Sequence, residues 1–343
     1  MNIVFAETVY KLSKCSFICI FKPMTETISQ NTPIIYLAPL QGFTDHVYRK
    51  AYSEVFEKID KWFIPYISVK NGSILKKYLK EIQVENNRQN NVVPQVLGKN
   101  PEEILILSKV LEDMGYMEIN LNLGCPYPMV TNRGMGSGLL PYPEKIKIIL
   151  DEFFSKSKLK LSIKMRAGFD SPQEIDKVIP VINQFPLTEV VLHPRIATQL
   201  YKGEVLDSAF IHAMQNLKHP LVYNGDIFSS EDFMKRQLKF PEINFWMLGR
   251  GILMNPFLPM EIKNIQISDQ EKSQKLQDFH NRILELYSDK MDNEGNVLNK
   301  MKQFWIYFSY VFPNQKKNLK TVKKASSIKK YSEVVKKMFW EIA

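Results

Sequence analysis

Cysteine is scarce in this sequence of 343 residues, and it occurs only as Cys15, Cys19 and Cys125. An odd and sparse count excludes a disulfide-stapled scaffold, and the absence of paired CxxC motifs excludes the common zinc sites, so we expect no metal. Free thiols are typical of a reducing compartment. The sequence therefore predicts a cytoplasmic protein that depends on an ordinary hydrophobic core.

A long apolar run is absent as well. The stretch CSFICIF at residues 15–21 is far shorter than the roughly 20 residues that cross a membrane. A basic start and a small-residue cleavage site are missing, which excludes a secretory signal of the usual kind. We expect residues 1–30 to form an N-terminal extension, with no membrane contact. Met24 is a candidate natural start, which would make residues 1–23 dispensable; a genuine additional segment is the alternative.

Excess charge is absent from most of the chain, because residues 1–299 carry 35 basic and 34 acidic side chains. Residues 300–343 differ, since eleven lysines and two acids give this segment a local charge of +9. The composition, with 45% hydrophobic and 24% charged residues, is that of a globular protein. A nearly neutral body with a basic end favours an anionic partner, most commonly nucleic acid, and a solvated lysine-rich helix face is the alternative.

Short apolar runs bounded by turn residues recur along the chain and are interpreted as strands. Eight are present, at residues 34–40, 61–69, 92–98, 118–126, 159–168, 189–195, 220–227 and 245–251. Segments of helical periodicity with proline near the first turn lie between them, at residues 101–115, 143–157 and 171–185. Strands that alternate with helices predict right-handed βα units on a parallel sheet.

Eight such units predict an α/β fold of the (β/α)8 TIM-barrel type over residues 31–265, because a barrel of this kind needs about 250 residues. A doubly wound open sheet is the competing architecture, but IIYLAPLQGFTD lacks the GxGxxG motif that commonly follows its first strand. The run GMGSG at residues 134–138 also has the wrong spacing. We interpret it as a flexible substrate-side loop or as a simple turn.

Long helical stretches follow the predicted barrel, and they predict a basic, all-helical domain over residues 268–343. Its aromatic residues between Phe304 and Tyr310 are interleaved with lysine, a pattern compatible with base stacking and phosphate contact. At helical spacing we expect most of them to form the core of this domain. One or two are expected to face a ligand.

In barrels the active site lies at the C-terminal ends of the strands, so polar residues there are candidates for function. A lysine within the apolar LSIKM is costly to bury alone, so we expect Lys164 to face an electron-rich group; a structural ion pair is the alternative. The loops NGDIFSS and LGRGILMNP follow the seventh and eighth strands, where barrels usually hold a phosphate. With Arg250 beside Gly249, these loops favour a cofactor such as FMN.

Seven segments, in this order and spacing, resemble those of the tRNA-dihydrouridine synthases, flavoenzymes that reduce uridine in tRNA. They are APLQGFTD, PQVLG, INLNLGCP followed by TNRGMGSGLL, SIKMRAGFD, LHPR, YNGDI and MLGRG. The resemblance covers residues 33–260, and KMKQFWIYFSYVF resembles the helical tRNA-binding domain of the bacterial C subgroup. It implies non-covalently bound FMN that NADPH reduces. The flavin then passes hydride to C6 of uracil while a cysteine protonates C5.

Cys125 matches that cysteine, and a step that needs a thiol rather than a thiolate suits a neutral, apolar setting. A buried, inert cysteine is the alternative. Lys164 matches the family's lysine beside the flavin, where a cation stabilises the anionic reduced ring. The other implied cofactor-binding residues are Pro39, Leu40, Gln41, Gln95, His193, Asn224, Gly225, Asp226, Gly249 and Arg250.

The resemblance also implies a set of tRNA contacts. Asn122 matches a residue that meets the target uracil, and the remaining implied contacts are Tyr201, Lys300, Lys302, Tyr307 and Lys323. The family pattern places Gly and Arg after the sixth-strand histidine and often Thr next, whereas this chain has Pro194, Arg195 and Ile196. This departure leaves the role of Arg195 open.

Two alternatives stand beside a tRNA-dihydrouridine synthase. A small-molecule flavin dehydrogenase of the dihydroorotate or dihydropyrimidine type can share an Asn and a Cys in a similar turn, but it leaves the basic segment unexplained. A non-catalytic tRNA-binding protein would not need Cys125. We expect a monomer, because the protein must wrap a large RNA. The sequence indicates neither which uridine is reduced nor whether NADPH is preferred over NADH.

Overall fold

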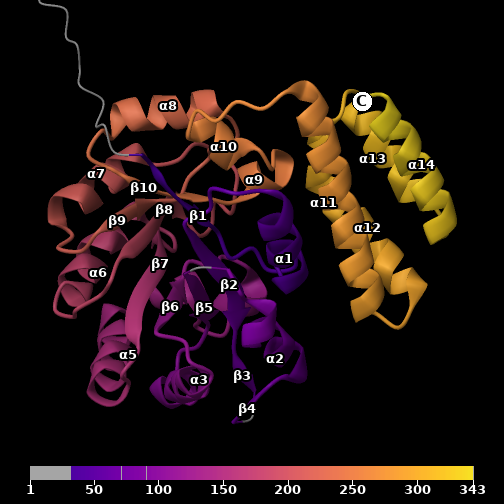
Figure 1. Cartoon of the computed structure of the whole chain (residues 1–343). Helices are drawn as coiled ribbons and strands as arrows, with labels where there is room; N and C mark the ends of the chain where they lie inside the picture. Colours follow the sequence, from indigo (N-terminus) through magenta and orange to yellow (C-terminus); the bar gives the residue numbers. More distant parts are fainter. Residues whose placement is uncertain (1–31, 71, 90, 343) are drawn as a thin grey trace, which may run out of the picture.

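Eight parallel strands close into a barrel in the order β1-β10-β9-β8-β7-β6-β5-β2 (Figure 1). The computed structural model describes residues 32–70, 72–89 and 91–342, so the expected N-terminal extension lies outside the described residues. Each of the eight apolar runs is a strand, which confirms the barrel. The strands are β1 (Ile34–Leu37), β2 (Lys61–Ile67), β5 (Val92–Val96), β6 (Glu118–Leu123), β7 (Lys160–Gly168), β8 (Val190–Ile196), β9 (Leu221–Tyr223) and β10 (Phe245–Leu248).

Helices cover the outside of the barrel, and two of them begin as the sequence predicts, with proline in the first turn at Pro101 and Pro143. In the third predicted segment Pro172 instead opens a short 3-10 turn (Pro172–Glu174), and the α-helix begins at Ile175. The prolines fit there because the first N–H groups of a helix have no internal partner. The barrel helices are α1 (His46–Val55), α2 (Lys76–Ile82), α3 (Pro101–Asp113), α4 (Pro128–Thr131), α5 (Pro143–Lys156), α6 (Ile175–Ile182), α7 (Asp207–Asn216), α8 (Ser230–Lys239), α9 (Arg250–Met254) and α10 (Leu258–Ile262). A short antiparallel pair, β3 (Val69–Lys70) and β4 (Ser73–Ile74), follows β2.

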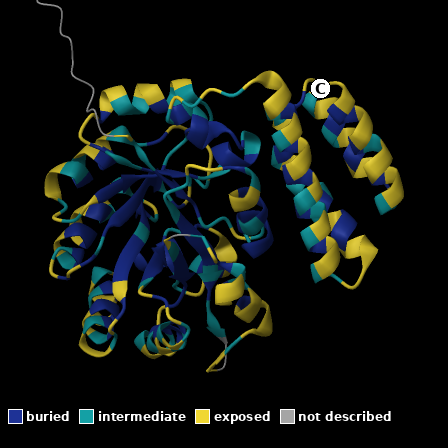
Figure 2. Ribbon diagram, in the orientation of Figure 1, coloured by how far each residue is buried: buried dark blue, intermediate teal, exposed yellow. Residues whose placement is uncertain are grey.

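The barrel strands are buried, whereas the helices expose their outer faces (Figure 2). Tyr36, Phe63, Val191 and Met247 belong to one apolar cluster contributed by several strands. At the strands' N-terminal ends Lys61 places its Nζ 2.9 Å from a carboxylate oxygen of Glu118 and 2.9 Å from one of Glu189. Apolar packing and this ion triad fill the barrel toward the N-terminal ends of its strands. The C-terminal ends are therefore left for a site. Among the described residues no helix is long and apolar enough to cross a membrane.

Four helices follow the barrel: α11 (Asp269–Lys290), α12 (Glu294–Phe308), α13 (Gln315–Lys324) and α14 (Ile328–Trp340). The last of the long helical stretches, residues 314–342, contains two helices, α13 and α14. The second begins at Ile328, where the hydroxyl of Ser327 accepts the N–H of Lys330 and caps the new helix. Trp305 and Phe308 are fully buried, as expected of a helical core, while Tyr310 is exposed.

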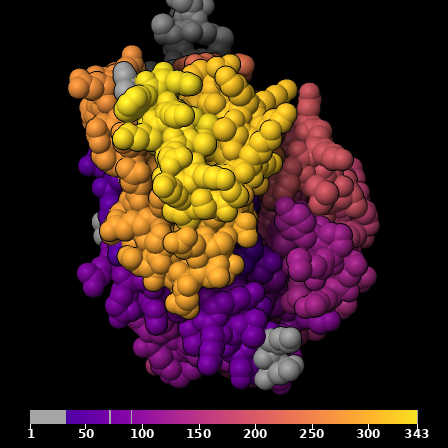
Figure 3. Space-filling model, turned by 90° about the vertical axis from the view of Figure 1, so that its right-hand side faces the viewer, coloured from indigo at the N-terminus to yellow at the C-terminus, as the bar shows by residue number. Residues whose placement is uncertain are grey.

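The helical segment packs on one side of the barrel and covers part of it in the space-filling view (Figure 3). Phe279 of α11 lies edge-on against Tyr48, Tyr52 and Phe56 of the α1 region, with ring centroids 5.2 to 5.8 Å apart. These residues belong to the same hydrophobic cluster as the helical core residue Trp305. Barrel and helices therefore share one continuous core.

Candidate active site

A cavity of about 450 Å³ opens at the C-terminal ends of the barrel strands. Its size is within the range of small-molecule and cofactor sites. The structure brings together all residues that the sequence assigned to catalysis and to the cofactor. The cavity is lined by Pro39, Leu40, Gln41, Gln95, Cys125, Lys164, His193, Asn224, Gly225, Asp226, Gly249 and Arg250. Asn122, Tyr201 and Tyr307 line it as well.

Cys125 lies in the loop after β6, and its thiol is largely buried beside Leu97 and Val130. Burial raises the pKa of the thiol, and the opposing effects of the Tyr127 N–H and of the cations Arg166 and Lys164 are smaller. The thiol is therefore protonated at neutral pH. This state suits a proton donor and does not suit a nucleophile.

Asn122 holds the loop that carries Cys125. Its side-chain oxygen accepts the backbone N–H groups of Gly124 (3.0 Å) and Cys125 (2.9 Å). Its amide nitrogen donates to Gln95 at 2.7 Å. Because these bonds use the oxygen fully, only one N–H of the amide is left for a ligand in the cavity.

A ladder of buried amides continues behind this residue across three strands. Gln95 donates to Asn120 at 2.8 Å, and Asn120 donates to Ser162 at 3.0 Å. The orientation of the Gln95 amide is therefore fixed, with its oxygen toward Asn122 and its nitrogen toward Asn120. Gln95 lines the cavity, and one N–H of its amide is without a partner among the described residues.

The glycine-rich run at residues 134–138 forms a packed turn under Cys125. Ser137 donates both its backbone N–H (3.2 Å) and its hydroxyl (2.8 Å) to the Cys125 carbonyl. Gly136 has φ +59°, and a Cβ there would stand 2.8 Å from that same oxygen. A turn was one of the two expectations for this run, and its residues Gly136 to Leu139 are buried rather than exposed as a substrate-side loop.

Lys164 lies on β7 beneath the cavity, and no described residue accepts a hydrogen bond from its ammonium or pairs with it. Burial, reinforced by the neighbouring charge of Arg166, lowers its pKa to about 7. The alternative of a structural ion pair is therefore wrong. A half-buried ammonium without a partner that faces a cavity fits an anionic group there, such as the reduced ring of a flavin, because that charge would restore its ordinary pKa.

Arg195 is buried and lies beside Asp226, a residue of the cavity wall. Its contacts give this residue the role that the departure at Pro194 and Ile196 had left open. Its guanidinium donates to both carboxylate oxygens of Asp226, at 3.1 and 2.6 Å. Arg250 donates to the same carboxylate at 2.8 Å. Burial alone would raise the pKa of Asp226, but the two arginines hold it below its ordinary value. Asp226 thereby aligns two cations beside the loops that were expected to hold a phosphate.

His193 contacts the same guanidinium, with its Nε2 3.3 Å from Nη1 of Arg195. Burial and the surrounding cations Arg166 and Lys164 lower its pKa well below the usual value, so the ring is neutral. An arginine can only donate, so Nε2 accepts and the ring proton is on Nδ1.

Tyr201 lies between two cations at the rim, 4.8 Å from the Arg250 guanidinium and 5.2 Å from that of Arg166. Arg166 itself donates to the carbonyls of Gly124 (3.1 Å) and Ile196 (2.8 Å). Arg166 therefore ties the Cys125 loop to the end of β8. Arg166 is one of the polar residues at strand ends that were candidates for function, but sequence reasoning assigned it no role.

The helical segment reaches the cavity through Tyr307, whose ring meets Phe43 edge-on at 5.0 Å. The expected tRNA contacts Lys302 and Lys323 do not line the cavity, and Lys323 is exposed on α13.

Lys300 was expected to contact RNA, but its ammonium group instead contacts other residues of the protein. It donates to the Gly42 carbonyl at 2.6 Å and lies 3.5 Å from Asp45. Asp45 also accepts the hydroxyl of Tyr287 at 2.9 Å. Lys300 thus joins α12 to the loop that follows β1.

Besides Arg166, sequence reasoning missed seven residues that line the cavity: Ala38, Phe43, Tyr66, Gly124, Pro126, Tyr127 and Met129. Tyr127 and Met129 follow Cys125 by two and four positions, so proximity to the catalytic loop was a usable signal. Phe43 and Tyr66 carried none, because apolar residues near strand ends are equally typical of a core.

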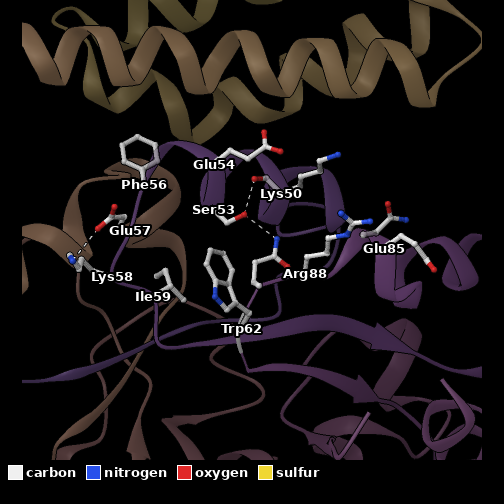
Figure 4. A pocket seen from close by; sticks show the side chains of 12 residues that line it. Lys50, Ser53, Glu54, Phe56, Glu57, Lys58, Ile59, Trp62, Glu85 and Arg88 are labelled. Carbon is white, nitrogen blue, oxygen red and sulfur yellow. Dashed lines mark hydrogen bonds and ion pairs between the residues drawn. The ribbon is translucent and has the colours of Figure 1, made fainter. Parts of the chain in front are cut away.

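A larger hollow of about 790 Å³ lies beside the C-terminal half of α1 (Figure 4). Trp62 and Ile59 form part of its wall, and its rim carries charges of both signs, including the paired Glu57 and Lys58. Trp62 stands at the N-terminal start of β2, away from the face where barrels place their chemistry. None of the predicted site residues lines this hollow.

Comparison with known proteins gives a consistent result. A family profile described as dihydrouridine synthase (Dus) matches residues 36–340. The chain is 26% identical over 226 residues to tRNA-dihydrouridine synthase B of Pasteurella multocida, covering 65% of this chain and 67% of that protein. It is 23% identical over 319 residues to the tRNA-dihydrouridine(16) synthase of Vibrio parahaemolyticus, covering 86% and 94% respectively.

Among solved structures, 2-naphthoyl-CoA reductase resembles the chain with a TM-score of 0.50 and 10% identity, over 68% of this chain and 50% of that one. At this identity the likeness concerns the fold alone.

Proposed function

The chain belongs to the dihydrouridine synthase family of flavin-dependent oxidoreductases that modify tRNA, and we propose that it reduces one uridine of tRNA with FMN as cofactor and NADPH as reductant. The observation that carries this proposal is a single cavity lined by a protonated cysteine and an unpartnered lysine. The reaction consumes one NADPH and one proton for each C5–C6 double bond that is saturated. When bound, the flavin would relay the hydride from the nicotinamide to C6 of the uracil.

The proton for C5 comes from Cys125. Its buried thiol retains the proton at neutral pH, and the bonds from Asn122 and Ser137 hold the loop in place. A proton donor must be presented at a defined position, and this loop is restrained from both sides.

Lys164 supplies the positive charge for the reduced cofactor, and Gln95 offers an N–H of fixed orientation to the ring edge. Arg250 and the loop residues Gly225 and Gly249 are the phosphate-binding residues in this proposal, and Asn224 is oriented by its bond to the Met247 carbonyl at 2.8 Å. Asp226 and Arg195 keep the Arg250 guanidinium in position.

The substrate base must leave its stack to reach this cavity, since Cys125 and Lys164 lie below the rim inside the barrel mouth. The RNA itself is proposed to bind over the helical segment, where Lys302 and Lys323 carry charge. Of the eleven lysines between residues 300 and 343, Lys300 alone is in an ion pair with a described residue. Unpaired lysines are available for phosphate groups.

The decisive experiment measures dihydrouridine by nucleoside mass spectrometry after reaction of the purified protein with unmodified tRNA and NADPH. A flavin-dependent gain of two hydrogens on uridine is expected. Cys125→Ala should retain the yellow flavin and bind tRNA. Its rate of product formation should fall by at least roughly 100-fold, because general acids contribute about 10²–10⁴-fold. Sequencing of the product maps the uridine, and position 16 is the first to inspect because the Vibrio relative is named for it.

Three other outcomes would contradict the proposal in distinguishable ways. Product formation by Cys125→Ala at the wild-type rate would remove Cys125 from the mechanism. A yellow protein that binds tRNA without modifying it indicates another RNA substrate. A yellow protein with no RNA affinity indicates a small-molecule dehydrogenase. Parallel reactions with NADH decide which nicotinamide is the reductant.

A further inference from the structure

Two large apolar side chains stand exposed at the mouth of the cavity. Tyr127 is 49% exposed and Met129 is 74% exposed, and both line the cavity that contains Cys125. No described residue covers them. Single exposed apolar residues are common on protein surfaces, but two at the rim of an active site form a contact surface that a substrate can use.

The backbone presents these side chains in a fixed way. The Tyr127 carbonyl accepts the N–H groups of Val130 (2.8 Å) and Thr131 (3.0 Å), and Val130 is buried beside Cys125. Pro126 and Pro128 flank the tyrosine and restrict the chain further. An aromatic ring held on a restrained loop loses little conformational entropy when it binds a planar partner.

Cations stand beside this apolar rim. Arg133 and Lys99 are exposed, and neither is in an ion pair with a described residue. The Lys99 chain reaches the glycine-rich turn, where a Cβ on Gly134 would lie 3.7 Å from its Cδ. An exposed aromatic ring and a thioether next to unpaired cations match the chemistry of an RNA strand, which offers base faces and phosphates together.

We propose that Tyr127 and Met129 form a lip that stacks on the base next to the extruded uridine, while Arg133 and Lys99 contact the adjoining phosphates. This inference rests on the proposed function. A uridine that enters the cavity leaves its neighbour without a stacking partner, and the lip replaces the lost contact at the point where the strand enters the site. The lip then helps to hold the uridine out of its stack.

The chain offers a matched control in Met117. It is 75% exposed, as Met129 is, but it precedes β6 and so stands at the opposite end of the strand that leads to Cys125. Three variants test the lip: Tyr127→Ala, Met129→Ala and Tyr127→Phe. Each is compared with wild type and with Met117→Ala.

Three readouts separate the possible occupants of the lip. The first is kcat/KM for dihydrouridine formation on unmodified tRNA. The second is the rate of flavin reduction by NADPH without RNA. The third is the affinity for unmodified tRNA, measured by anisotropy.

We expect Tyr127→Ala to lower kcat/KM for tRNA by about tenfold or more, because the base loses its stacking contact with the aromatic ring. Met129→Ala should lower it less, whereas Tyr127→Phe and Met117→Ala should keep the wild-type value. Flavin reduction by NADPH should be unchanged in all variants.

Equal loss in flavin reduction would assign the lip to the nicotinamide and overturn the proposal, as would wild-type kcat/KM and affinity in Tyr127→Ala. Failure of the proposed function is recognised separately, because wild-type protein would then form no dihydrouridine. In that case a selective loss of RNA affinity in Tyr127→Ala still supports the lip, and unchanged affinity overturns it.

Discussion

At the scale of single residues, the protonation of Cys125 determines the pH range of the reaction. Burial raises the pKa of its thiol above the ordinary value, so the acid form persists through neutral pH. Ionisation removes the proton donor, and the rate should therefore be flat from pH 6.5 to about 9, where an ordinary thiol has already begun to ionise. Above its raised pKa the rate should fall about tenfold per pH unit.

Single-turnover reaction of the reduced enzyme with tRNA measures this profile without interference from NADPH. An inflection between pH 7 and 8 would mean that the thiol ionises readily and would contradict the role of burial. Cys125→Ser provides the comparison, because a hydroxyl does not ionise in this range and its lower rate should show no such fall.

The lowered pKa of Lys164 should make the stability of the flavin-free protein depend on pH. Its pKa of about 7 in the flavin-free fold is below that of the unfolded chain, so between pH 7 and 10.5 the unfolded state binds more protons and stability rises with pH. Lys164→Met removes this half-buried, unpartnered amino group. At pH 8 we expect the flavin-free variant to be more stable than wild type by roughly 1–3 kcal/mol, and to bind the cofactor more weakly.

Urea denaturation of flavin-free wild type and variant at pH 7, 8 and 9.5 measures this difference. The gain should shrink as pH rises toward 10.5, since the lysine of the unfolded chain then loses its proton as the folded one already has. A variant less stable than wild type at pH 8 would indicate that Lys164 already has a partner in the flavin-free protein.

Polar residues at strand ends could be identified as candidates because strand ends converge in a barrel, and the resemblance to a known family supplied their roles. Lys164 and Asn224 are far apart in the sequence, yet both follow from the position of their strands. Pairings across the cavity could not be predicted, because the contact of Arg195 with Asp226 depends on how two loops fold. Lys300 was assigned to RNA for the same reason, since its sequence neighbours do not reveal Gly42 as its partner.

At the scale of elements, the glycine-rich turn after β6 supports the catalytic loop. Gly136→Ala would place a Cβ 2.8 Å from the Cys125 carbonyl and 3.0 Å from its Cβ, at φ +59°. We expect a loss of roughly 2–4 kcal/mol in unfolding free energy, from left-handed strain plus displacement of the loop. Product formation should fall more than flavin retention does.

Gly115→Ala is the matched control, because Gly115 has φ +90° and nothing lies within 4 Å of the added Cβ. It should lose about 1 kcal/mol from strain alone and keep full turnover. Chemical denaturation and single-turnover rates compare the two variants. Equal effects in both would show that the turn contributes backbone conformation only and does not position Cys125.

The strands and the barrel helices followed from periodicity, because alternation of βα units restricts the topology to few solutions. The division of residues 314–342 did not follow, since Ser327 as a helix start competes with an uninterrupted pattern of lysine and apolar residues. The packing of α11 on α1 is also invisible in sequence. Phe279 is an ordinary apolar position until Tyr48 and Tyr52 are placed opposite it.

At the scale of the whole molecule, the helical segment packs on the barrel through apolar residues and carries the lysines that are proposed to bind RNA. Its core is continuous with that of the barrel through Phe279, and Tyr307 contributes to the cavity wall. Removal of residues after 268 would expose the aromatic cluster on α1, so truncation is a poor test of RNA binding. Substitution of lysines that pair with no described residue, such as the half-buried Lys302 and the exposed Lys323, leaves the apolar residues of this core in place and isolates the electrostatic contribution.

The double variant Lys302→Gln and Lys323→Gln is therefore expected to weaken tRNA binding without lowering the melting temperature. Each phosphate contact that is lost should reduce the slope of log K against log salt by roughly 0.7–0.9, so the slope should fall by about 1.5 for both. Lys158→Gln with Lys160→Gln is the control, because these exposed lysines lie before and at the start of β7, at the opposite end of the barrel. A slope that changes equally in both pairs would show a diffuse effect of net charge, whereas a change confined to Lys302 and Lys323 assigns the RNA path to the helical segment.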